Sequence, residues 1–367
     1  MAKEKIPVFF ATNRNRVSGD GYFGERFHSD GPSFYRCGQA LVEFDSDADE
    51  YTLISSGLEA ERKPADPSGR GARLGSTAMF RQIRDTMAAE EREALVLIHG
   101  FGNSFVGSLL RGAQLSREYR IARVPEAPGG PEPAPQSPIV VVFSWPSNGR
   151  VQPPWEYHSD REDSQQSGDA MARFFMRFWD FLNDPGKRGT DADGRPLPCG
   201  RPIHLVAHSM GNWALRAAVQ SIKRMMAGRA VPKVFDNVFL MAADADEDAL
   251  AQEEKLYPMI EMARAIHVYH ASNDRALVVS DTTKFNPDRL GTDGPHSFAR
   301  LPPHVTAIDC ADVSYTELAD ARHQYYSSRQ EVLDDVRAVL TGRYAPDQVP
   351  RRIAIDPGRR YRIPRAT

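Results

Sequence analysis

Ser209 is the residue whose setting most strongly indicates covalent chemistry. It stands within Ile203–Arg216, where an apolar run typical of a buried strand leads directly into an apolar helical pattern. The small residues Ala207 and Gly211 flank it in the order Ala-His-Ser-Met-Gly. A serine on such a sharp turn is lifted clear of the sheet, and the helix amino terminus beneath it favours a developing negative charge. We therefore interpret Ser209 as a nucleophile; the alternative is a serine that caps the helix.

A second segment contains glycines where a backbone would need to approach a substrate closely. The apolar run Leu95–Ile98 is followed by His-Gly-Phe-Gly at residues 99–102 and then by a helical pattern. Glycine lets the backbone come near a reacting carbonyl group. We expect the backbone N–H groups of Phe101 and Met210 to form an oxyanion hole. The alternative is a strand-to-helix turn that needs glycine only for its geometry.

The elements that must position these residues alternate along the chain. Short apolar runs typical of buried strands are separated by longer helical patterns, which predicts an α/β fold with a mostly parallel central sheet and helices on both faces. The expected strands are Ile6–Ala11, Tyr51–Ile54, Ala94–His99, Ile139–Phe143, Ile203–Ala207, Val234–Met241, Ala265–His270 and Val305–Asp309. The expected helices include an apolar stripe from Met171 to Leu182, a buried helix Met210–Met226, Glu247–Met262, and a last helix that stops at Gly342.

We expect one catalytic domain with an addition at each end. Residues 91–342 form the catalytic core, and residues 1–90 form an N-terminal extension whose early strands belong to the same sheet. Residues 343–367 form a basic C-terminal tail, which we expect to be solvated or draped on the surface. Three segments rich in proline, glycine or aspartate are expected to be surface insertions: 124–138, 183–202 and 281–303.

Composition excludes several other classes of protein. The 367 residues carry 49 acidic and 46 basic side chains, so the net charge of −3 gives no general reason to expect nucleic acid as a partner. The cysteines, Cys37, Cys199 and Cys310, are too few and scattered for a disulfide framework. No apolar stretch approaches the roughly 20 residues of a membrane span, and the first apolar run is too short for a signal peptide. We expect a cytoplasmic protein.

Other motifs give little reason to expect a metal or a nucleotide. His204 and His208 are four residues apart, but on a strand that spacing is roughly 13 Å, too far for one ion. The alternating aspartates of residues 244–248 imitate a calcium loop, yet Ala249 stands where glycine is required. The Asn-Arg-Asn-Arg run at 13–16 is only a faint phosphate-binding pattern. We predict neither a metal nor a cofactor.

The two glycine- and serine-containing motifs resemble the α/β-hydrolase superfamily. The forms His-Gly-Phe and Ala-His-Ser-Met-Gly-Asn are similar to a poorly characterised bacterial branch known only as a domain of unknown function. The likeness covers roughly residues 90–340 and includes Phe143–Ser147 and Ser272–Leu277. Ala207 departs from the superfamily, which usually has glycine at that position. The resemblance implies an α/β-hydrolase fold and a serine hydrolase of the esterase and lipase type.

A nucleophilic serine also needs an imidazole base and an anionic partner for that base. In the superfamily these follow in the order serine, acid, histidine. Of the downstream histidines, His267 and His270 lie inside an expected strand, and His296 and His304 precede one, at the wrong edge for a site at the carboxyl ends. His323 follows the last expected strand of the core, where the resemblance implies the catalytic histidine.

Two aspartates compete for the role of the acid. Asp244 and Asp274 each follow an expected strand, and for either one the alternative is a turn or a helix N-cap. The resemblance favours Asp274, so the expected triad is Ser209, Asp274 and His323. Trp145, together with Trp155 and Tyr157, follows another strand and is expected either to line the substrate pocket or to anchor a loop.

These residues together predict two-step acyl transfer. Ser209 attacks a small-molecule acyl ester, His323 acts first as base and then as acid, Asp274 orients His323, and water releases the acyl group. Because an imidazole must be neutral to accept a proton, activity should rise through roughly pH 6 to 7. Thioester or amide cleavage and acyl transfer to an alcohol would use the same triad. A non-catalytic binding or scaffold protein that retains the serine turn is the alternative of a different class.

Overall fold

The computed structural model describes residues 3–18, 22–59, 75–123, 133–150, 155–183, 189–190, 196–197, 200–277, 288–314 and 323–366. Most of the expected insertion 124–138, and large parts of 183–202 and 281–303, lie outside these residues. Short strand pairs are described at β8 (Gly189–Thr190) and β9 (Pro196–Leu197).

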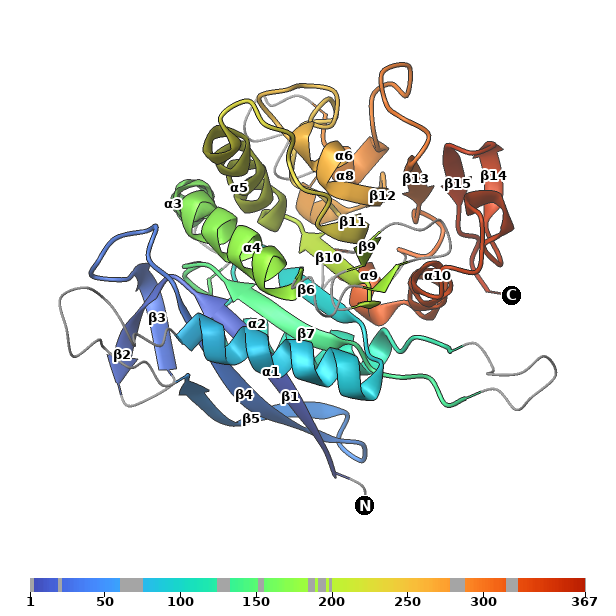
Figure 1. Cartoon of the computed structure of the whole chain (residues 1–367). Coiled ribbons are helices and arrows are strands. Elements are labelled where there is room, and N and C mark those ends of the chain that lie inside the picture. The colour runs from blue at the N-terminus through green and yellow to red at the C-terminus, as the bar shows by residue number, and fades with distance from the viewer. Residues whose placement is uncertain are drawn as a thin grey trace.

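An 11-stranded sheet runs through the whole molecule, with β5 at one end and β14 at the other (Figure 1). The strands from β15 to β1 are parallel to one another, whereas β14, β4 and β5 run antiparallel to their neighbours. In spatial order they are β14 (Ile353–Asp356), β15 (Arg360–Arg362), β13 (Val305–Asp309), β12 (Ala263–His270), β11 (Phe235–Met241), β10 (Ile203–His208), β6 (Ala94–Ile98), β7 (Ile139–Ser144), β1 (Lys3–Thr12), β4 (Arg36–Asp45) and β5 (Glu50–Leu58).

Helices cover both faces of this sheet, as the alternation of apolar runs predicts. One face packs against α1 (Gly75–Glu90), α4 (Gly168–Leu182) and α5 (Gly211–Met226); the other packs against α2 (Phe105–Glu118), α9 (Tyr325–Ser328) and α10 (Gln330–Leu340). Alternate strand residues face opposite cores, Val96 one and Leu97 the other, because side chains alternate along a strand. The central strands are therefore apolar throughout, and the predicted fold class is confirmed.

The strands near the N-terminus belong to the same sheet. β1 lies between β7 and β4 and pairs in parallel with β7, so that Phe9 faces Val141. A separate hairpin of β2 (Arg14–Ser18) and β3 (Tyr22–Phe27) follows β1 directly. The sequence analysis did not identify β4, in which Arg, Gly, Gln and Glu interrupt the apolar residues.

The arginine-rich segment after residue 342 is also part of the sheet. β15 pairs in parallel with β13, and β14 pairs with β15 at the edge. The sequence predicts a solvated or surface-draped tail, and the four residues of β14 are exposed, but Tyr361 of β15 is buried. The apolar residues between the arginines explain the difference, because they let the segment extend the sheet.

The helix expected over Glu247–Met262 is wrong. Most of that segment forms successive turns, and only α6 (Pro258–Met262) is helical. The backbone N–H groups of Ala249 and Ala251 donate to residues three positions earlier rather than continuing a helix. Proline is tolerated at the first turn of a helix but not inside one, so Pro258 can only begin a helical segment.

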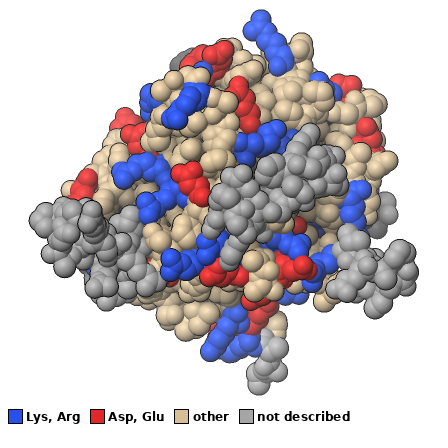
Figure 2. All heavy atoms as spheres, viewed as in Figure 1, with Lys and Arg blue, Asp and Glu red and all other residues tan. Residues whose placement is uncertain are grey.

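Charges of both signs are interspersed over the face shown in Figure 2. Among the residues that the structure describes, there is no helix both long enough and apolar enough to cross a membrane. Cys37 and Cys310 are both buried.

Candidate active site

Ser209 occupies a strained turn between β10 and α5. Its φ angle is 51°, in the left-handed region that a residue with a side chain rarely adopts. A Cβ atom on Gly211 would lie 2.7 Å from the carbonyl oxygens of Ile98 and His99, and one on Gly100 would lie 2.9 Å from the Cβ atom of Ser209. The strand end, the helix start and the loop after β6 therefore meet so closely that both glycines are required.

The backbone of Ser209 is held in this conformation by its neighbours. Its N–H donates to the carbonyl oxygen of Met241 at 2.9 Å. Its own carbonyl oxygen accepts from the backbone N–H and the side-chain amide of Asn212, both at 3.0 Å, and from the N–H of Asp244 at 3.2 Å. A left-handed residue of this kind costs on the order of 1–3 kcal/mol and persists only when the surrounding structure fixes it.

His323 and Asp274 form a buried pair. The His323 Nδ1 atom lies 2.6 Å from the Asp274 Oδ2 atom, and the two residues are 9% and 0% exposed. Because a carboxylate accepts hydrogen bonds, the proton between the two groups belongs to Nδ1, and in the neutral ring Nε2 then carries the lone pair. A ring oriented in this way can take a proton from a hydroxyl group.

The pair lies beside the serine turn. The His323 ring is 4.7 Å, centroid to centroid, from the ring of His208, the residue directly before Ser209. His208 Nε2 donates to the backbone carbonyl of His323 at 3.2 Å, and its ring stacks on Tyr326 at 4.4 Å. Burial holds the pKa of His208 well below its usual value, so this ring is a neutral support for His323.

The two candidate acids have different partners. Asp274 Oδ1 accepts from the N–H groups of Ala276 and Leu277 at 3.1 and 3.2 Å, so Asp274 caps a turn with one oxygen and binds His323 with the other. Asp244 instead accepts from the Tyr157 hydroxyl at 2.5 Å and lies 3.4 Å from the Arg289 guanidinium. The structure therefore brings Asp274, rather than Asp244, to His323.

The two expected oxyanion donors follow different strands, Phe101 in the loop after β6 and Met210 in the turn after β10. Met210 is buried directly before α5, and Phe101 follows Gly100, which contacts the Ser209 turn. Within the described part of the chain, no acceptor is bonded to the N–H of Phe101. The indole of Trp145 donates to the carbonyl of His99 at 2.8 Å and the side chain is fully buried, so this tryptophan anchors the loop. The side chain of Trp155 lies outside the described residues.

Two other histidines considered from the sequence, His204 and His267, lie away from this site. His204 binds Glu93 through Nε2 at 2.8 Å, at the opposite end of β10 from Ser209. His267 is buried between Thr306 and Asn237, and burial lowers its pKa to about 3. Among the described residues, no group of three or more histidine, cysteine or acidic side chains is arranged to hold a metal ion.

Two buried arginines near the site were not identified as such from the sequence. Arg289 is fully buried beside Asp244 and Asp246. Arg14, in the run considered as a phosphate pattern, is 1% exposed and donates to backbone carbonyls and a serine hydroxyl instead. Arginine is so rarely buried that its position in the sequence gave no such signal.

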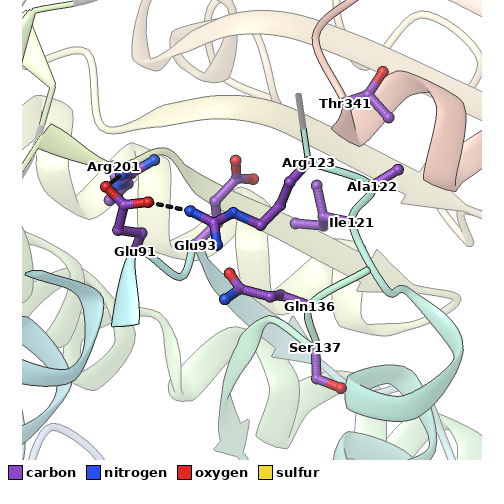
Figure 3. Close-up of a pocket in the computed structure, with 9 residues that line it drawn as sticks. All are labelled: Glu91, Glu93, Ile121, Ala122, Arg123, Gln136, Ser137, Arg201 and Thr341. Atoms are coloured by element: carbon purple, nitrogen blue, oxygen red, sulfur yellow. Dashed lines mark hydrogen bonds and ion pairs between the residues drawn. The ribbon is translucent and has the colours of Figure 1, made fainter. Parts of the chain in front are cut away.

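A pocket of about 360 Å³ lies at the amino ends of the central parallel strands (Figure 3). Its lining includes Glu93, Ser137 and Arg201, which precede β6, β7 and β10. Ser209 follows β10, so this pocket and the serine turn are at opposite ends of the same strands. In the pocket, Glu91 lies between Arg123 and Arg201 and binds both, the latter at 2.6 Å.

A strained serine at the carboxyl end of a central parallel strand, in a sheet covered on both faces, defines the chain as an α/β-hydrolase. The model of one family, described as an alpha/beta hydrolase of unknown function (DUF900), matches residues 76–187 and 195–343, well over half of the chain. The chain belongs to that family. No curated protein and no solved structure matches it. β1 to β5 precede the matched segments.

Proposed function

We propose that the protein is a serine hydrolase that cleaves a carboxylic ester through an acyl-enzyme intermediate. The observation that carries this proposal is the buried hydrogen bond between His323 Nδ1 and Asp274 Oδ2, 2.6 Å long, beside the strained turn of Ser209. In the neutral form of this imidazole, the Nε2 lone pair would accept the proton of the Ser209 hydroxyl group.

The reaction would proceed in two steps. His323 Nε2 takes the proton as Ser209 Oγ attacks the ester carbonyl, and the N–H groups of Phe101 and Met210 stabilise the oxyanion. His323 then gives the proton to the departing alcohol, which leaves the acyl group on Ser209. A water molecule, activated by the same imidazole, releases the acid and restores the serine.

Two physical arguments favour catalysis over a binding or scaffold role. A left-handed serine stores strain that a helix cap does not need, because capping requires only extended backbone before the helix. Burying the carboxylate of Asp274 is costly unless it is paired, and here its partner is an imidazole rather than a permanent cation. Strain and a buried carboxylate–imidazole pair together are typical of a catalytic site.

A fluorophosphonate probe tests the proposal directly. We expect the probe to label wild type and not Ser209→Ala, and we expect hydrolysis of short p-nitrophenyl esters to fall by roughly 10⁶-fold in that variant. Ser221→Ala is the matched control, since Ser221 is a buried serine on α5, the helix that follows Ser209, and its hydroxyl group binds Asp169. Folded wild type that resists the probe, or labelling that survives in Ser209→Ala, would reject the assignment.

The pH dependence gives a second measurement. Neutral His323 is the active form, so kcat/KM should rise as the imidazole loses its proton, through roughly pH 6 to 7, and then level off. A flat profile across that interval would remove His323 from the role of base.

A further inference from the structure

Arg14 is an unusual residue to find inside a protein. It lies at the start of β2, immediately after the central strand β1, and is 1% exposed. Burial lowers the pKa of its guanidinium to about 9, so it still carries a charge at neutral pH. A buried charge is costly unless hydrogen bonds compensate it, and such residues are often retained for a specific geometric purpose.

The guanidinium of Arg14 joins three segments that are far apart in the sequence. Nη2 donates to the carbonyl oxygen of Asn103 at 2.8 Å, and Nη1 donates to those of Ser147 at 2.9 Å and Gly24 at 3.0 Å. Nε donates to the hydroxyl of Ser144 at the end of β7, also at 3.0 Å. The planar fork of arginine can make these bonds together, whereas the single ammonium group of lysine cannot reproduce the geometry.

Asn103 extends this hydrogen-bond network to the loop after β6, which contains Phe101. Its side-chain amide donates to the carbonyl oxygens of Gly100 at 3.0 Å and Phe101 at 3.2 Å. Its backbone N–H donates to the Ser147 hydroxyl at 3.1 Å, and that hydroxyl binds Asp160. Arg14 therefore fixes Asn103, and Asn103 fixes the two peptide groups on either side of the Phe101 Cα atom.

We propose that Arg14 is a positioning residue for the oxyanion hole, supplied by a part of the chain outside the segments that match the family. It acts through Asn103 by setting the direction of the Phe101 N–H. This inference rests on the proposed function, because the Phe101 N–H matters to catalysis only if Ser209 performs acyl transfer. It also assigns a role to the N-terminal extension, which would complete the catalytic core as well as widen the sheet.

The test compares an ester with its thionoester in Arg14→Lys. Oxyanion-hole donors stabilise a negative charge on oxygen far better than one on sulfur. A misdirected Phe101 N–H should therefore slow hydrolysis of the ester more than hydrolysis of the thionoester. We expect kcat/KM for a p-nitrophenyl ester, normalised to active sites counted from the acylation burst, to fall by about 10- to 100-fold. The ratio of ester to thionoester rates should fall about 10-fold.

Arg352→Lys is the matched control. Arg352 is another buried arginine, bound to Asp335 at 2.7 and 2.8 Å, in the segment that leads into β14 at the other end of the sheet. We expect this variant to lose stability while keeping the ester-to-thionoester ratio. Asn103→Ala removes the link itself at a partly exposed position and should lower the ratio as Arg14→Lys does, even if Arg14→Lys does not fold.

Three outcomes decide the inference. An unchanged ratio in folded Arg14→Lys and Asn103→Ala would overturn it. An equal loss in Arg352→Lys would also overturn it, because the effect would then be a general result of removing a buried arginine. If wild type cleaves neither ester and resists the probe, the proposed function fails. Hydrogen exchange then still tests the structural claim, because the backbone amides of residues 100–103 should exchange at least 10-fold faster in Asn103→Ala than in wild type. Unchanged exchange would overturn that claim.

Discussion

The two ends of the central parallel strands differ in how deeply their charged residues are buried. We call the end where these strands finish the carboxyl edge of the sheet and the end where they start the amino edge. At the carboxyl edge, Asp274 and Arg14 are almost completely buried and each makes several hydrogen bonds of defined direction. At the amino edge, Glu91 binds Arg123 and Arg201 with side chains 49%, 34% and 33% exposed (Figure 3). Both edges contain ion pairs or charged hydrogen bonds, but Asp274 and Arg14 are far more deeply buried than Glu91 and its two partners.

That difference in burial predicts a difference in consequence. Charged groups in contact with water interact weakly and exchange partners readily, whereas buried ones keep a fixed geometry and act through a low dielectric. Fixed dipoles are what stabilise charge in a transition state without reorganisation. We therefore expect substitutions at the carboxyl edge to change rates strongly, and those at the amino edge to change stability slightly.

The largest effect expected in this comparison is at Asp274. Asp274→Asn keeps the size of the side chain but removes the charge that holds His323 in its active tautomer, so kcat should fall by roughly 10⁴-fold. Steady-state hydrolysis of a p-nitrophenyl ester measures it. Asp244→Asn changes the other candidate acid, and the fall in kcat there should be at least 100-fold smaller. An equal or larger loss at Asp244 would make Asp244 the catalytic acid.

A smaller effect is expected where the carboxyl edge is most tightly packed. In Gly100→Ala the new methyl group would lie 2.9 Å from the Ser209 Cβ atom and 3.1 Å from the His208 carbonyl oxygen. The turn must shift, so kcat/KM should fall by roughly 10- to 100-fold. Gly57→Ala is the control, since a Cβ atom there meets nothing within 4 Å. Full activity in Gly100→Ala would mean that the serine turn tolerates displacement.

The smallest effect is expected at the amino edge. Arg201→Met removes an ion pair that is partly exposed to solvent, so the free energy of unfolding should fall by less than about 1 kcal/mol and kcat should stay within about twofold of wild type. Urea unfolding and ester hydrolysis measure the two quantities. A loss of activity greater than 10-fold would show that the two edges are coupled through the strands.

The sequence was most informative where local pattern and burial agree. The apolar runs of β6, β7 and β10 predicted the parallel sheet, because only strands covered on both faces are apolar throughout. The serine turn was recognisable because its small flanking residues are adjacent in the chain. The pairing of His323 with Asp274 was expected only from the resemblance, since these residues are 49 positions apart.

Contacts between segments that are distant in the sequence could not be predicted from local sequence pattern. Nothing near Arg14 indicates that its guanidinium reaches Asn103, Ser144 and Ser147, because that contact depends on how β1 pairs with β7. The turns after Asp246 were mistaken for a helix because the aspartates at their start resemble a helix N-cap, whereas their backbone N–H groups close separate turns. β4 lacks a continuous apolar run and was missed for that reason.

The position of β1 also constrains the order of events while the protein is being made. β1 leaves the ribosome before both of its partners; its antiparallel partner β4 follows within about 30 residues, but its parallel partner β7 begins only at Ile139. A local meander of β1, β4 and β5 can therefore form early, whereas its other edge must wait for the later strand. During that interval the backbone edge of β1 that later pairs with β7, at residues 9–12, is open to wrong partners. Chaperone dependence of the nascent chain should accordingly end once β7 has been synthesised.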